Sequence, residues 1–308
     1  MAQLINAMPG AIAQGLIWGI MAIGLYITYK VLDFADLTVD GSLCTGAAVC
    51  GILLINGVNV WVCMLVAFAA GMLAGGVTGL FHTLLGIPPI LSGILTQLML
   101  WSVNLKIMGG ATIAFSSRNY SVVITQMELA QAILVAFGFC AVLIVLLYFF
   151  FGTEIGCALR ATGNNEKMSN AQGIDVRFAK VLGLMLSNGL VALSGALLGQ
   201  YQGSADINMG RGAIVIGLAA IIIGQSVVSA FGSNFALKLS GAALGGVIYY
   251  MVYTFVIWLG LDTDLLKMLS ALVVAFFLGA SYWKKTCFPN RKKTAPAGAV
   301  TGGEGKDA

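Results

Sequence analysis

Long apolar runs recur along this chain, and they constrain its fold more than any other feature. The first, at 9–29, would measure about 31 Å as an α-helix, which is enough to cross the hydrocarbon core of a bilayer. Eight further runs lie at 42–56, 59–81, 88–108, 130–152, 180–200, 213–228, 239–260 and 265–282. The sequence therefore predicts an all-α polytopic membrane protein with about nine transmembrane helices. The run at 42–56 is short enough to be tilted or broken.

The composition agrees with a membrane protein. Hydrophobic residues make up 59% of the chain and charged residues 9%, and the mean hydropathy is +0.95. A soluble globule of this composition would expose large apolar patches. The formal charge of +4 reflects where the lysines lie and does not suggest a nucleic-acid partner. We expect a membrane domain over residues 1–283, with the first run retained as a span, and a basic, disordered cytoplasmic tail over 284–308.

Residues suited to catalysis or metal binding are sparse. His82 is the only histidine, and none of the six cysteines has C-x-x-C spacing, so we expect no metal centre and no cofactor. The aspartates Asp33, Asp36 and Asp40 form the only candidate catalytic group, and weak Mg²⁺ binding there is an alternative. We interpret them as a solvated loop in which Asp40 or Ser42 caps the next helix. The sequence therefore predicts a protein that is not an enzyme.

Residues 153–180 form the only long charge-rich stretch between apolar runs. Thr153 is placed to cap a first short helix, with Glu154 in its first turn and Gly163 as its stop. An apolar stripe of this helix would consist of Ile155, Ala158 and Leu159. Asn164 or Asn165 would cap a second helix through Met168 and Ala171, which Gly173 ends. This pattern predicts either a docking element for a partner, at about 153–176, or a solvated loop between two spans.

The predicted spans hold no Asp, Glu, Lys or Arg at depth, which argues against ion-coupled transport, although sodium sites built from carbonyls stay open. Uncharged polar side chains within the spans either line a path for a polar solute or hydrogen-bond between helices. The candidates for the path are Gln97, Asn104, Ser187, Asn188 and Gln225. Three GxxxG matches, which begin at Gly71, Gly195 and Gly241, favour a compact bundle.

The lysines and arginines predict the orientation. With 153–180 and the tail in the cytoplasm, we count about 12 Lys and Arg on the inside against about 4 outside. Nine spans then place the N-terminus outside and the C-terminus in the cytoplasm of a plasma or inner membrane. The chain has no G-x-x-x-x-G-K-[ST] phosphate loop, so if ATP drives it, the ATPase is a separate chain.

Two motifs resemble a known family. The segment GCALRATGNNEKMSNAQGIDV is similar to the cytoplasmic loop of ABC importer permeases for branched-chain amino acids and ribose. The matching residues are Gly156, Leu159, Arg160, Ala161, Gly163, Asn165, Ala171, Gly173 and Ile174. The segment DLTVDGSLCTGAAV, residues 36–49, resembles the D-L-S-V-G-S segment of ribose-type permeases, with Asp40 inserted before Gly41. The similarity covers residues 9–283, and within the family the chain is most similar to a single-permease branch that carries amino acids such as tryptophan and tyrosine.

This resemblance implies a type II-like permease bundle with no covalent chemistry of its own. Its partners would be ATP-binding cassette ATPase subunits, an extracytoplasmic solute-binding protein, a second permease copy and membrane lipid. The residues expected to couple it to the ATPase are Glu154, Leu159, Arg160, Gly163, Asn165, Ala171 and Gly173. We therefore predict the permease subunit of an ATP-driven importer for a small polar solute, an amino acid. A sugar or nucleoside importer and a self-contained channel or facilitator are the alternatives.

Overall fold

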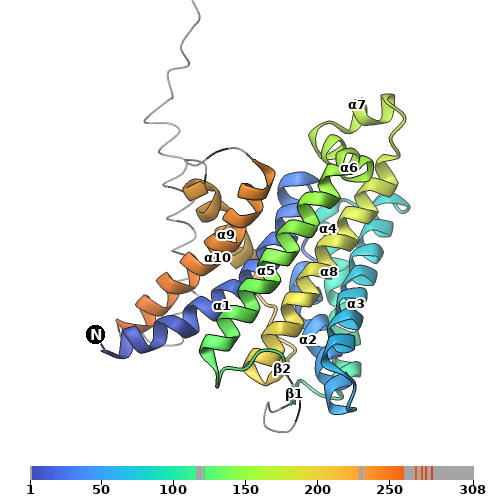
Figure 1. Cartoon of the computed structure of the whole chain (residues 1–308). Coiled ribbons are helices and arrows are strands. Elements are labelled where there is room, and N and C mark those ends of the chain that lie inside the picture. The colour runs from blue at the N-terminus through green and yellow to red at the C-terminus, as the bar shows by residue number, and fades with distance from the viewer. Residues whose placement is uncertain are drawn as a thin grey trace, which may run out of the picture.

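The computed structural model describes residues 2–115, 120, 122–228, 232 and 234–259, together with the isolated positions 268, 272, 275 and 279. In this part the chain is a helical bundle with a short two-stranded sheet at one end (Figure 1). The elements are α1 (Ala2–Tyr26), the π-helical η1 (Ile27–Val31), α2 (Val39–Ile55), α3 (Val60–Thr83), α4 (Pro89–Met108), β1 (Thr112–Ala114), α5 (Leu129–Gly152), α6 (Glu154–Asn164), α7 (Glu166–Ala171), α8 (Val176–Gln202), β2 (Ser204–Asp206), α9 (Ala213–Val228) and α10 (Phe235–Trp258).

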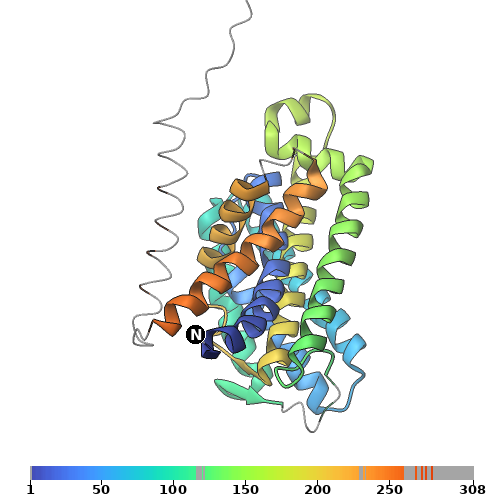
Figure 2. The same cartoon turned by 60° about the vertical axis from the view of Figure 1, so that its left-hand side comes forward.

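Helix α8 is the centre of the bundle, and α1, α2 and α3 pack against it (Figures 1 and 2). Small residues make these contacts possible. A Cβ at Gly46 would overlap the Ala192 carbonyl, and one at Gly71 would overlap the Asn188 carbonyl. The two helix backbones therefore approach α8 more closely than larger side chains would allow, as small residues permit in membrane bundles. The predicted compact packing at the GxxxG sites is confirmed, since Gly195 and Gly241 also lie against backbone of neighbouring helices.

Two helices are short and begin inside the bundle. Helix α2 has 17 residues and α9 has 16, whereas the six helices long and apolar enough to cross a membrane have 20 or more. Helix α2 lies in the half of the bundle that holds the strands, because its Gly51 packs on Phe115 beside β1. Helix α9 lies in the half that holds α6, because it packs on the first half of α10, whose Phe235 contacts Arg160 of α6. Each short helix is therefore shorter than any of the six long helices and runs toward one end of the bundle only.

The start of each short helix carries an aspartate contact. Asp36, just before α2, is buried and bonds Asn188, which lies near the middle of α8. Asp40, in the first turn of α2, accepts hydrogen bonds from the backbone N–H groups of Gly212 and Ile214, both at 3.0 Å. The interpretation of these aspartates as a solvated loop is therefore wrong for Asp36. Asp40 caps a helix start, but that of α9 and not that of α2, because α2 already begins at Val39.

A small antiparallel sheet closes the end of the bundle opposite α6 and α7 (Figure 1). Strand β1 pairs with β2, with Thr112 opposite Asp206, in segments that lie between the predicted apolar runs. The Thr112 hydroxyl donates to Asp206 at 2.7 Å, and the Asn208 N–H donates to it at 2.7 Å. These hydrogen bonds, the one from Thr112 first, hold the pKa of Asp206 below its usual value.

The predicted helical bundle is confirmed, but the count of about nine transmembrane helices is not. Eight of the nine predicted runs form helices, and six of these are long and apolar enough to cross a membrane. The ninth predicted span, 265–282, lies almost wholly outside the described residues, as does the tail over 284–308. The other helices overlap their predicted runs. Helix α4 begins at Pro89, directly after Pro88, whereas α1 begins at Ala2, seven residues before its predicted start at residue 9.

Candidate functional site

Helices α6 and α7 project from one end of the bundle, and local capping fixes them (Figures 1 and 2). The Thr153 hydroxyl accepts the Gly156 N–H at 3.3 Å, and the Asn165 carboxamide accepts the Met168 N–H at 3.1 Å. Gly173, with φ of +81°, turns the chain after α7. These predicted caps are confirmed. The prediction that Gly163 stops the first helix is wrong, because α6 continues through Asn164.

Gly163 has a different role, which is close packing. A Cβ at Gly163 would overlap the Val31 carbonyl at the end of η1. One turn earlier, Leu159 is fully buried, and its side chain lies with Leu32 over Gly183 of α8. Helix α6 is therefore seated directly on η1 and α8. A displacement of α6 has to move these two elements with it, because little space is left at the contacts.

An ionic contact holds α7 to the rest of this end. Lys180 Nζ lies 2.7 Å from Glu166 Oε1 and 3.3 Å from His82 Nε2. His82 Nδ1 is 2.8 Å from the Ile87 carbonyl, so the arrangement fits a neutral imidazole that donates from Nδ1 and accepts at Nε2. Lys180 of α8 therefore contacts both α7, through Glu166, and the end of α3, through His82.

The outer face of the projection combines charges with exposed apolar side chains. Glu154 and Arg160 are exposed, and so are Ile155 and Met168, each at half of its surface or more. Phe178, in the first turn of the adjoining α8, is exposed as well. Apolar side chains on a charged projection from a membrane bundle are typical of a surface that contacts another protein.

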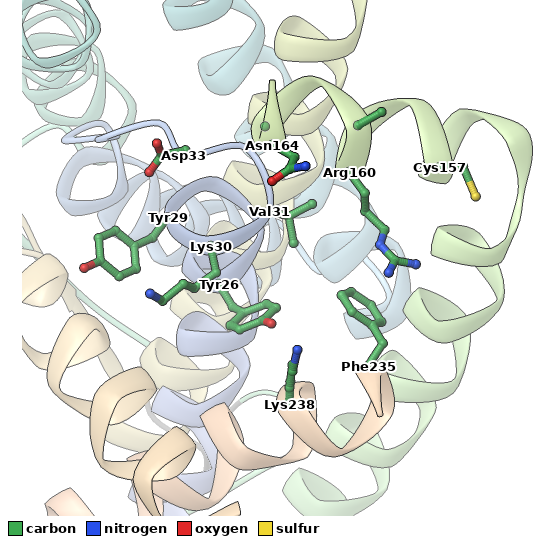
Figure 3. A pocket seen from close by; sticks show the side chains of 12 residues that line it. Tyr26, Tyr29, Lys30, Val31, Asp33, Cys157, Arg160, Asn164, Phe235 and Lys238 are labelled. Atoms are coloured by element: carbon green, nitrogen blue, oxygen red, sulfur yellow. The ribbon is translucent and has the colours of Figure 1, made fainter. Parts of the chain in front are cut away.

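A cavity of about 830 Å³ opens beside α6, between η1 and the start of α10 (Figure 3). Arg160 lies over the ring of Phe235, with 5.3 Å between the guanidinium carbon and the ring centroid. Lys30 and Lys238 also line the cavity, and Asp33 is the one carboxylate among its lining residues. This opening is therefore cationic, and it reaches from the projection to the ends of α1 and α10.

The predicted coupling residues all lie on this projection. Helix α6 carries Glu154, Leu159, Arg160 and Gly163, and Asn165, Ala171 and Gly173 belong to α7 and its two ends. The predicted path residues, in contrast, are dispersed over three helices. Gln97 and Asn104 of α4 line a second cavity of about 330 Å³, Ser187 and Asn188 lie in the core, and Gln225 is on α9.

Asn188 and Ser187 make their hydrogen bonds within the bundle. Asn188 accepts from the Ser42 hydroxyl at 2.6 Å, and its amide donates to Asp36 at 2.6 Å. Ser187 donates to the Gly24 carbonyl at 2.7 Å. For these two residues, the geometry favours interhelical hydrogen bonding over the lining of a path.

The sequence analysis missed the roles of Asp36 and Asp40. Both lie in a segment whose polar residues suggest a loop, and their partners are more than 140 positions away. The available signal was the pair of short apolar runs, because interrupted spans in the two parts of a transporter indicate helices that start within the membrane.

Comparisons with known proteins point to one family. A family model described as "Branched-chain amino acid transport system / permease component" matches residues 8–278. The tyrosine transport system permease protein of Clostridioides difficile is 40% identical over 86% of this chain and 88% of its own length. A fructose import permease protein of Bifidobacterium longum is 27% identical over 78% of this chain and 67% of its own length, and the ribose import permease protein of Escherichia coli is 23% identical over 79% and 77%. No solved structure matches.

Proposed function

The chain belongs to the family of branched-chain amino acid transport system permease components, which are ABC transporter permeases, and from this premise we propose that it is the membrane subunit of an ATP-driven importer of an amino acid. ATP hydrolysis would occur on separate ATP-binding cassette subunits. An extracytoplasmic solute-binding protein would deliver the solute, and a second copy of the chain would complete the pathway in the cell membrane. The main alternatives are a sugar or nucleoside importer and a self-contained facilitator.

The observation that carries the proposal is the way α6 is built. Its outer face is exposed and has both charged and apolar side chains, whereas its inner face, through Leu159 and Gly163, is seated on η1 and α8. A partner that grips the outer face can therefore move the bundle, because the inner face transmits the displacement. Two packed arrangements of the bundle would open the pathway to each side in turn.

The proposed orientation puts α6 and α7 in the cytoplasm and the N-terminus outside. The cations Lys30, Arg160 and Lys238 meet at the α6 end (Figure 3), in agreement with the excess of Lys and Arg expected on that side. The N-terminus lies toward the end of the bundle opposite α6 and α7 (Figures 1 and 2). The sheet would then face the binding protein.

Related permeases differ in what their names say they transport. The relative with 40% identity is named for tyrosine, and more distant ones for fructose and ribose. The higher identity and the nearly full coverage favour an amino acid. Sugar transport is the second candidate, supported by those sugar permeases.

A charge reversal on α6 tests the proposal. The complex that co-purifies with the chain is reconstituted in liposomes, and both ATP hydrolysis and uptake of L-tyrosine are measured for Arg160→Glu. We expect hydrolysis to continue while uptake per ATP falls at least tenfold. Lys106→Glu, a matched charge reversal in the last turn of α4, away from α6, should leave the uptake per ATP unchanged. Retained coupling in Arg160→Glu, or flux through the chain without ATP, would argue for a facilitator, and uptake of ribose in place of tyrosine would favour the sugar candidate.

A further inference from the structure

The second cavity lies between the first turn of α2 and helix α4. Its volume is about 330 Å³, within the range of sites for single small molecules, about 300–1,000 Å³. Asp40 contributes from α2, Gln97 and Asn104 from α4, and Arg211 from the segment after β2. The cavity is therefore at the point where the two short helices meet, since Asp40 also caps α9.

Two polar groups in this cavity have no partner among the described residues. Asn104 is 1% exposed, and its carboxamide oxygen accepts no hydrogen bond, although its amide nitrogen lies 3.5 Å from the Gly41 carbonyl. Leaving a buried acceptor unpaired costs about 1–3 kcal/mol, so such a group calls for a donor from outside the chain. Arg211 is exposed and forms no ion pair within the described residues.

Asp40, in contrast, is already engaged. Its two oxygens accept the N–H groups of Gly212 and Ile214, each at 3.0 Å. This hydrogen bonding fixes the start of α9 and the backbone on either side of Gly212, and so positions the neighbouring Arg211. The carboxylate also places one negative charge in the wall of the cavity.

We propose that this cavity binds an α-amino acid with a large apolar or aromatic side chain. The guanidinium of Arg211 receives the solute's carboxylate, and the Asn104 oxygen accepts a hydrogen bond from its ammonium group, which the Asp40 charge also attracts. Leu98 and Trp101, which line the open side, carry the solute's side chain. The proposal deepens the proposed function and rests on it for the direction of transport only.

A neutral sugar fits this set of groups less well. Its hydroxyls would satisfy Asn104 and Gln97, and its ring would stack on Trp101, but it has no charge for Arg211. Guanidinium is suited to bidentate binding of a carboxylate. If the cavity binds an amino acid, binding should depend on Arg211 only for solutes that have a carboxylate. This dependence therefore distinguishes amino acids from sugars.

Direct binding to the purified full-length chain in nanodiscs tests the site without requiring ATP. The ligands are radiolabelled L-tyrosine, tyramine, which lacks the carboxylate, and ribose. We expect Arg211→Gln and Asn104→Leu each to weaken tyrosine binding at least tenfold, whereas Arg211→Gln leaves tyramine binding unchanged. Arg211→Lys should have an intermediate effect. Lys106→Gln, an exposed cation on α4 outside the cavity, is the matched control and should bind like the unmodified chain.

The outcomes separate the site from the transport function. Tyrosine binding unaffected by Arg211→Gln, an equal loss for tyrosine and tyramine, or binding of ribose alone would overturn the proposal. Because Arg211 is exposed, its variants test the site even if Asn104→Leu fails to fold. If tyrosine binding by the chain alone is below detection, the KM of uptake in the reconstituted complex decides, and an unchanged KM overturns the site. If uptake does not depend on ATP but tyrosine binding follows the expected pattern, the proposed importer function is overturned and the proposed site is not.

Discussion

The α6–α7 projection and the centre of the bundle satisfy their polar groups in opposite ways. On the projection, Thr153 and Asn165 bond backbone N–H groups three residues along the chain and remain exposed. At the centre, Asn188 joins Ser42 and Asp36, which are 146 and 152 positions away, and all three are buried. One region carries its hydrogen bonds with it when it moves, whereas the other loses them when its helices separate.

This difference indicates which parts of the molecule can move during transport. Helices α6 and α7 can shift together with η1 and α8 while their caps stay intact, so moving them breaks few hydrogen bonds. Separating α2 from α8 would break the hydrogen bonds that join Asn188 to Ser42 and Asp36 in an apolar interior, at about 1–3 kcal/mol for each group left without that partner. We therefore expect transport to rearrange the bundle around an intact Asp36–Asn188 contact.

The largest expected effect comes from breaking the central contact. Asp36→Ala removes the acceptor of both the Thr38 N–H, at 2.9 Å, and the Asn188 amide. We expect a loss of about 3 kcal/mol in stability and a strong decrease in the yield of folded protein, because buried donors are left unpaired. Thermal unfolding in detergent, followed by size-exclusion yield, measures both.

Asp175→Ala is the matched control for that variant. Asp175 is exposed and caps α8 by accepting the N–H groups of Arg177 and Phe178. Loss of such a cap costs about 1 kcal/mol. Equal losses in the two variants would show that the central contact has no special weight.

A second pair of variants tests how α6 is seated. Gly163→Ala places a methyl group against the Val31 carbonyl, and we expect a destabilisation of about 1–3 kcal/mol and weaker coupling of ATP hydrolysis to uptake. Gly138, in the middle of α5, has open space around it, so Gly138→Ala should be neutral or stabilising by up to about 1 kcal/mol through helix propensity. Thermal unfolding of both variants gives the sign directly, and a stabilising Gly163→Ala would contradict the close seating.

The same contrast explains what could be predicted from the sequence. The caps Thr153 and Asn165, the turn at Gly173 and the start of α4 at Pro89 all depend on neighbours within a few residues, and all are as predicted. Gly163 was misjudged because a glycine that stops a helix and one that packs against another helix have the same sequence signature. Only the Val31 carbonyl, far along the chain, decides between them.

The central aspartates show the limit more clearly. A polar segment such as 30–41 is expected to be a loop on local evidence, and nothing local indicates that Asp36 meets Asn188 or that Asp40 caps α9. Two predicted path residues, Gln97 and Asn104, line the cavity near α4, but Arg211 reaches it from the segment between β2 and α9, outside every apolar run. These residues come together only through contacts between distant parts of the chain, and such contacts cannot be read from local sequence patterns.

A smaller effect is expected from the ion pair between α7 and α8. Glu166→Gln removes the charge 2.7 Å from Lys180, but Glu166 is half exposed, so solvent screens the pair and the loss should be less than about 1 kcal/mol. The loss should shrink further in high salt. Thermal unfolding at low and high ionic strength checks this, and Lys167→Gln, an exposed neighbour with no ion pair in the described residues, is the control.

The smallest expected effect is at the other end of the molecule, in the sheet. The Thr112 hydroxyl and the Asn208 N–H hold the pKa of Asp206 below its usual value, which is about 3.9 in unfolded chains. Because the folded pKa is the lower one, the stabilisation is complete above the unfolded value and is lost as the pH falls through the folded value. Thr112→Val removes the hydrogen bond that lowers the pKa of Asp206 most. The variant should therefore be less stable than the unmodified protein at pH 7, by less than about 1 kcal/mol because Asp206 is mostly solvated, and the difference in stability should decrease toward pH 3. Unfolding temperatures across this range measure it, and a difference that grows on acidification would mean that the hydroxyl does not stabilise the carboxylate.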